Sequence, residues 1–126
     1  MLCPMGPSSP AVVGRALELS VDRLALFECL STPWHGQDIL VTRTDPIGLL
    51  GYDLVAPSTI AEELWECLVE AGKPDLIQPI GQQTMEALRI EGGIPAWGTE
   101  LSEAYNPLEA GLTNSISWTK GCYIGQ

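Results

Sequence analysis

The chain has few basic residues, a single histidine and no long apolar run. Six Lys and Arg against sixteen Asp and Glu give a formal net charge of −10 over 126 residues. Nucleic acids and anionic membranes need a basic surface, so neither is predicted as the main partner. No apolar stretch reaches the length of about 18 residues that a membrane span needs, and the N-terminus lacks the charged start of a signal peptide. The sequence therefore predicts a cytoplasmic protein.

The potential metal ligands are also sparse. The four cysteines, Cys3, Cys29, Cys67 and Cys122, are far apart and form no C-x-x-C pair, and His35 is the only histidine. Zinc sites and disulfide frameworks both need closely spaced or paired ligands. We predict no metal site and no disulfide framework.

Glycine and proline are abundant, and they divide the chain into short elements. At this length we expect one domain over residues 1–126. Apolar spacing predicts helices over residues 10–19, 59–71 and 82–90. The residues expected to face inward are Val12, Val13, Ala16 and Leu17 in the first helix, Ile60, Leu64 and Leu68 in the second, and Met85 and Leu88 in the third. The second has the strongest signals, because Thr59 and Glu62 fit a capping box and glycine and proline follow its last turn.

The strand pattern is clearest in the middle of the chain. Residues 39–44 and 51–55 are rich in β-branched and aromatic side chains, and the turn-forming residues 45–48 separate them, which predicts a β-hairpin. A strand before the first helix and a short strand before the third complete the order. A Gly/Pro-rich tail follows over residues 92–119, with Trp97 expected in the core. The fold class predicted is α+β, an antiparallel sheet with helices packed on one face, of the ferredoxin-like type.

The last seven residues carry the most suggestive chemistry. Cys122 lies between Lys120 and Tyr123, with glycine on either side of the Cys-Tyr-Ile stretch. A nearby ammonium favours the thiolate, and glycine lets the backbone approach a ligand. The alternative is that Cys122 is a small buried hydrophobe, as most free cysteines are.

Three motifs in one order resemble a known family. Residues 120–126 resemble the K-G-C-Y-x-G-Q-E signature of the YgfZ-like folate-binding proteins, relatives of the glycine cleavage T-protein (aminomethyltransferase). Residues 88–93 resemble the L-R-x-E-x-G of both branches, and residues 107–112 resemble their P-x-E-A-G-L. Weaker matches are a G-P at residues 6–7 and a G-Y-E-I-like strand at residues 51–54.

The resemblance implies both a fold and a function. The chain looks like the second half of a folate-binding domain, a fragment that ends one residue before the signature does. The main prediction is a tetrahydrofolate-binding accessory protein that supports iron–sulfur cluster assembly or repair, with iron–sulfur proteins as partners. The alternative is a tetrahydrofolate-dependent aminomethyltransferase of the T-protein type. A third hypothesis is that the isolated piece folds but is inactive, because half of the pocket is missing.

Two residues bear on folate binding through the resemblance. Arg89 stands where the family's arginine helps hold the folate, and a guanidinium can pair with a carboxylate through two hydrogen bonds. The alternative for Arg89 is a surface ion pair with Glu86 at i−3. Leu49 stands where T-proteins have a glutamate that binds the pterin. A leucine can contact a ring but cannot accept its hydrogen bonds, which favours the YgfZ-like branch.

The terminal motif supplies the remaining candidates. Through the resemblance, Cys122 is a functional thiol, with Lys120 beside it and Tyr123 placed among the folate contacts. One cysteine cannot hold an iron–sulfur cluster, since such clusters usually take four thiolates. We therefore expect Cys122 to act as a redox-active group or as a transient ligand shared with a partner.

Overall fold

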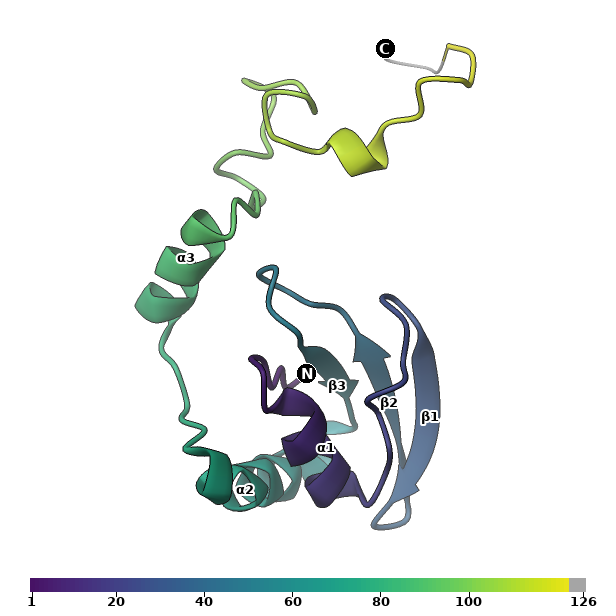
Figure 1. The fold of residues 1–126 in the computed structure, drawn as a ribbon, viewed down its shortest axis with the longest axis vertical. Coiled ribbons are helices and arrows are strands. Elements are labelled where there is room, and N and C mark those ends of the chain that lie inside the picture. Colours follow the sequence, from purple (N-terminus) through teal and green to yellow (C-terminus); the bar gives the residue numbers. More distant parts are fainter. Residues whose placement is uncertain (123–126) are drawn as a thin grey trace. The chain divides into compact units, whose positions relative to one another are not determined.

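The chain has two compact units. The structure, a computed structural model, describes residues 1–122. Unit 1 is Met1–Gly81 and contains a sheet with its core, whereas unit 2 starts at Gln82 and contains one α-helix followed by turns (Figure 1). The single domain over residues 1–126 stays a prediction. No helix within residues 1–122 is both long enough and apolar enough to cross a membrane.

Unit 1 is built on a three-stranded antiparallel sheet in the order β1-β2-β3. The strands are β1 (Cys29–Trp34), β2 (Gln37–Arg43) and β3 (Tyr52–Val55). A two-residue turn joins β1 to β2, and His35 and Gly36 both take the positive φ angles of such tight hairpins. The pairing of β2 with β3 confirms the predicted hairpin. The strand β1 is not predicted, because it contains Ser31 and Pro33 and no marked run of apolar side chains.

Two helices cover one face of this sheet (Figure 1). They are α1 (Ser9–Leu17) and α2 (Ala61–Gly72). The predicted inward stripe of α1 is confirmed, since Val12, Val13, Ala16 and Leu17 are all buried. In α2 the buried apolar residues are Leu64 and Leu68, four positions apart and hence on one side of the helix. A short 3-10 turn, Ser58–Ile60, leads into α2.

The core of unit 1 lies between the helices and the sheet. Ile39 and Val41 of β2 and Leu54 of β3 are fully buried there against the helices. Two buried aromatic residues place their polar atoms on backbone carbonyls. Tyr52 donates its hydroxyl hydrogen to the oxygen of Val21 at 3.1 Å, and the Trp34 indole donates to Ala16 at 3.3 Å. Both rings therefore stabilise the core without leaving a buried donor unpaired.

The N-terminal residues extend the sheet beside β3. Leu2 and Leu54 exchange backbone hydrogen bonds of 3.0 and 2.8 Å, and Met5 bridges to Gly51. These are isolated bridges, so the strand expected before the first helix is present only as local pairing. The bridges nevertheless satisfy backbone groups on the outer edge of β3.

Unit 2 begins with α3 (Gln82–Glu91), which ends where the sequence predicts. Gly93 takes a positive φ of 65°. The N–H of Ile94 donates to the oxygen of Arg89 at 2.9 Å, and the N–H of Gly93 donates to Ile90 at 3.0 Å. This pair of hydrogen bonds is the Schellman motif, which a glycine at this position permits.

Three predictions for unit 2 and the preceding linker are wrong. Residues 77–81 contain no strand, so the short strand expected before α3 is absent. Met85 and Leu88 are half-buried instead of buried, and Trp97 is 89% exposed. The described part of unit 2 has one α-helix and no named strand against which these side chains could pack. The broader prediction of an α+β fold with an antiparallel sheet is confirmed.

Candidate functional site

Arg89 is the only charged residue that the described structure buries, and it lies in the last turn of α3. Its side chain is 11% exposed. The Nε atom donates to Glu86 at 2.8 Å, and Nη2 donates to the other oxygen of the same carboxylate. Nη1 donates to the carbonyl of Ile94 at 2.8 Å and to Glu100 at 2.9 Å. Hydrogen bonding to Glu86, and then to Glu100, raises the pKa of Arg89, so the guanidinium stays charged.

Glu100 joins the turn after α3 to that helix. One of its oxygens accepts hydrogen bonds from the Thr99 hydroxyl at 2.6 Å, the Ala96 N–H at 3.1 Å and Arg89. Thr99 and then the backbone N–H of Ala96 lower the pKa of Glu100 to about 2. The carboxylate is therefore the centre of this turn, and the ion pair with Arg89 connects the turn to α3.

Acid is expected to open this turn. Because the pKa of Glu100 is lower in the folded chain than its usual 4.5, its contacts stabilise unit 2 fully above that value. The stabilisation is lost as the pH falls from about 4.5 towards about 2. We expect the amide signal of Ala96 to move through that window in NMR spectra, together with the Glu100 carboxyl carbon.

The variant Glu100→Gln provides the control for this titration. It cannot ionise, so the Ala96 amide signal should lose this pH-dependent movement. A Glu100 carboxyl carbon that titrates at the usual value of a free glutamate would contradict the assigned contacts.

The P-x-E-A-G-L segment lines a concave surface in the same unit. The concavity has a volume of about 460 Å³, and Trp97, Tyr105, Pro107 and Leu112 contribute apolar walls to it. Glu109 of this segment has a structural contact instead: it accepts a hydrogen bond from the N–H of Asn106 at 2.9 Å. Asn106 in turn accepts from the N–H groups of Leu108 and Glu109, each at 3.0 Å. This reciprocal exchange resembles a capping box and fixes the turn.

Leu49 lies in the loop between β2 and β3, in unit 1. Asp45 organises this loop, because one carboxylate oxygen accepts from the N–H of Gly51 at 3.1 Å and both oxygens accept from Arg43 at 3.1–3.2 Å. The hydrogen bond from Arg43 is the main cause of the lowered pKa of Asp45. Leu49 is 42% exposed at the loop surface. The hydroxyl of Thr44, at the start of the loop, is buried and has no hydrogen-bond partner among the described residues.

The terminal candidates receive less support. Lys120 and Cys122 are exposed, so the alternative of a buried Cys122 is wrong for the described structure. Tyr123 lies outside the described residues. Within the described part of unit 2, no hydrogen bond or ion pair joins Arg89 to Lys120 or Cys122. Residues 1–122 also contain no group of three or more His, Cys, Asp or Glu arranged to hold a metal ion.

The group of charged side chains around Arg89 contains one partner that the sequence predicts, Glu86, and one that it does not, Glu100. The ion pair of Arg89 with Glu86, the alternative interpretation of the i−3 spacing, is present. Glu100 is the missed member of the group. It is eleven positions from Arg89 and is brought there by the Schellman turn and the turn that follows, so no helical spacing predicts it.

Known proteins resemble this chain over its whole length. It matches the family described as the GCVT N-terminal domain over residues 1–120. It is 34% identical to a protein named aminomethyltransferase from Chlorobium phaeovibrioides, and 37% and 35% identical to proteins of that name from Chlorobaculum parvum and Chlorobaculum tepidum. Each comparison covers 100% of this chain but 35% of the relative. The chain thus spans about a third of the length of the curated relatives it matches.

These findings correct the main functional prediction. The accessory role in iron–sulfur cluster assembly or repair is wrong, because the relatives that match the whole chain carry the name aminomethyltransferase. That prediction gave most weight to residues 120–126, whereas the family match lies almost wholly before them. Iron–sulfur partners are likewise unsupported. The alternative prediction, with its T-protein relationship, agrees better with the comparisons.

Proposed function

Since the chain belongs to the GCVT N-terminal domain family, we propose that it forms part of a tetrahydrofolate-dependent aminomethyltransferase. The observation that carries the proposal is the 34–37% identity, over all of this chain, to proteins with that name. A match that covers the whole chain supports a shared fold better than a short motif does. In this proposal the reduced folate is a substrate.

Arg89 is the residue proposed to bind the folate. Its planar guanidinium already holds the Glu86 carboxylate through two parallel hydrogen bonds, which is the geometry that any carboxylate ligand would need. The glutamate tail of a folate carries such carboxylates. The burial of the Arg89 side chain limits competition from water and strengthens its attraction for an anion.

Leu49 is proposed to supply an apolar contact. Asp45 and Arg43 hold its loop, and the side chain is partly exposed at the surface. A leucine can pack against a ring edge but leaves the polar groups of that ring to water or to other partners. We therefore propose that recognition in this chain depends more on the charge of Arg89 than on polar contacts from the β2–β3 loop.

Four finer assignments remain part of the proposal. We place the chain in the second half of a folate-binding domain, with the ferredoxin-like arrangement that the sequence predicts. Tyr123 stays a predicted folate contact. A cytoplasmic location is likewise proposed, on the basis of the composition.

Titration of the chain with 5-formyltetrahydrofolate, followed by NMR, tests the proposal. We expect the Nε–H signal of Arg89 to shift in a saturable way. Arg89→Lys lacks this signal, so its binding is followed at the backbone amides of Ile94 and Glu100, which lie beside Arg89. The variant should weaken binding by about tenfold or more, because lysine keeps the charge but cannot donate two parallel hydrogen bonds.

The matched control is Arg15→Lys, which makes the same substitution at an exposed ion pair with Asp75 in unit 1. It should leave the affinity unchanged. An Arg89 signal that does not move at millimolar ligand would contradict folate binding by this chain.

A further inference from the structure

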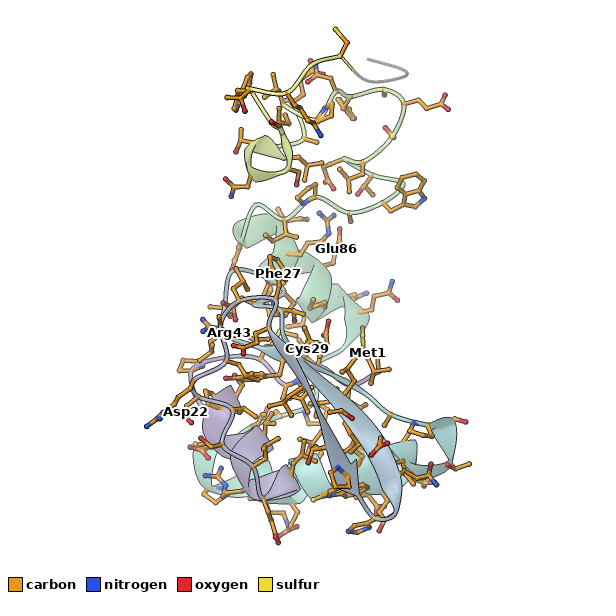
Figure 2. The ribbon with its side chains drawn as sticks, turned by 90° about the vertical axis from the view of Figure 1, so that its right-hand side faces the viewer. Met1, Asp22, Phe27, Cys29, Arg43 and Glu86 are labelled. Atoms are coloured by element: carbon orange, nitrogen blue, oxygen red, sulfur yellow. The ribbon has the colours of Figure 1, made fainter. Side chains whose placement is uncertain are left out.

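The two carboxylates that contact Arg89 are held very differently. Glu100 also accepts hydrogen bonds from Ala96 and Thr99, so three donors fix it within its turn. Both carboxylate oxygens of Glu86 contact Arg89, and this carboxylate has no other hydrogen-bond partner among the described residues. The Glu86 side chain is 50% exposed and projects from α3 (Figure 2). One carboxylate is therefore anchored, and the other can leave.

We propose that Glu86 is an internal competitor that occupies the guanidinium fork of Arg89, and that a carboxylate-bearing ligand enters by displacing it. Glu100 and the carbonyl of Ile94 keep Nη1 in place during this exchange. The Nε–H and one Nη2–H of Arg89, which donate to Glu86, then donate to the carboxylate of the ligand instead. The inference concerns the proposed folate site, but it requires only a carboxylate and no pterin.

The exchange costs little free energy because one carboxylate replaces another. A ligand carboxylate would make the same two charge-assisted hydrogen bonds that Glu86 makes. Glu86 can rotate away without moving the helix backbone, and its half-exposed carboxylate is then solvated by water. The anchored side of the guanidinium keeps its orientation, so the binding geometry is organised in advance.

The consequence of this internal competition is a lowered affinity. A site that is open for only part of the time binds with an apparent Kd raised by the inverse of the open fraction. If Glu86 leaves the fork free roughly a tenth of the time, removing its charge should tighten binding of an external carboxylate about tenfold.

The test uses glutarate as a carboxylate probe and the Nε–H signal of Arg89 as the reporter. We expect Glu86→Gln to bind glutarate about tenfold more tightly than the unmodified chain, with the change seen at Arg89. Glu91→Gln is the matched control, since it removes one negative charge from an exposed position of the same helix, and Glu91 is not among the hydrogen-bond or ion-pair partners of Arg89 in the described residues. It should change the Kd less than twofold.

Two further variants define the group that binds the probe. Glu86→Ala removes the side-chain oxygens altogether, so it should show the gain even if the amide oxygen introduced by Glu86→Gln still occupies the fork. Adding Arg89→Lys to Glu86→Gln removes the Nε–H reporter, so glutarate binding is followed there at the backbone amide signals of Ile94 and Glu100, whose oxygen atoms contact Arg89. This double variant should lose the gain, which separates Arg89 from Lys120 as the binding group. Equal affinity in Glu86→Gln, Glu86→Ala and Glu91→Gln would overturn the proposal.

The same samples separate this inference from the proposed function. Titration with 5-formyltetrahydrofolate in parallel shows whether a folate binds at all. If the Glu86 variants bind glutarate more tightly but no folate binds, the internal competitor is supported and the folate site is contradicted. If folate binds but the Glu86 variants bind neither ligand more tightly, the folate site is supported and the internal competitor is contradicted.

Discussion

Replacing Leu64 by alanine is expected to lower the free energy of unfolding of unit 1 by about 3 kcal/mol. Leu64 lies in the first turn of α2, is fully buried and belongs to the core between the helices and the sheet. The substitution removes apolar contacts and leaves a cavity that close-packed neighbours fill only in part. Against a total of roughly 4–12 kcal/mol for a unit of this size, the loss is large. Urea unfolding followed by circular dichroism measures it.

Leu76→Ala is the matched control for this substitution. Leu76 follows α2 closely in the chain but is 83% exposed, so the same deletion removes little buried surface. We expect a change within about 0.5 kcal/mol there. Equal losses for the two variants would show that the stripe of α2 that contains Leu64 does not face the core.

The features predicted best from the sequence are those that depend on local periodicity. The apolar stripe of α2 and the inward face of α1 follow from spacings of three and four residues, and both are present. The capping box expected at Thr59 is not, because Ser58–Ile60 forms a 3-10 turn and no side chain caps α2. The periodic spacing of apolar residues predicts that a helix is present, whereas the residue at which it begins depends on the geometry of the preceding turn.

The features that could not be predicted depend on contacts between segments. The strand β1 is stabilised by its pairing with β2 rather than by its own composition. Trp97 illustrates the reverse error: a large apolar side chain favours burial, but the described part of unit 2 offers it no core. The candidate site shows the same difference between local and non-local contacts. The i−3 spacing on one helix predicts the contact of Glu86 with Arg89, whereas the contact of Glu100 depends on the two turns that follow the helix.

Gly72, the last residue of α2, is expected to tolerate substitution poorly, although positions near the end of a helix usually accept other residues. A Cβ atom at Gly72 would lie 1.7 Å from the Cγ2 atom of Ile77 and 2.8 Å from its Cβ atom. The backbone of Ile77 is held by the hydrogen bond from its N–H to the oxygen of Gly72, and its side chain packs against the core. Relief therefore requires movement of the backbone as well as a side-chain rotation.

We expect Gly72→Ala to destabilise unit 1 by about 1–3 kcal/mol, the usual range for overpacking. This outcome opposes the helix propensity, by which alanine is favoured over glycine by about 1 kcal/mol inside a helix. Thermal and urea unfolding of the variant measure the loss. Combining Gly72→Ala with Ile77→Ala should recover part of it, since the closest clashing atom is then removed, and the double-mutant cycle reports the coupling between the two positions.

Gly81→Ala separates the clash from the general effect of adding a methyl group. A Cβ atom at Gly81 meets no heavy atom within 4 Å in the described structure, and its φ angle is not in the left-handed region. The substitution there should be neutral or slightly stabilising, because it restricts the unfolded chain. If Gly72→Ala were equally harmless, the packing of Ile77 against the end of α2 would be wrong, because a methyl group could then be added there without displacing that side chain.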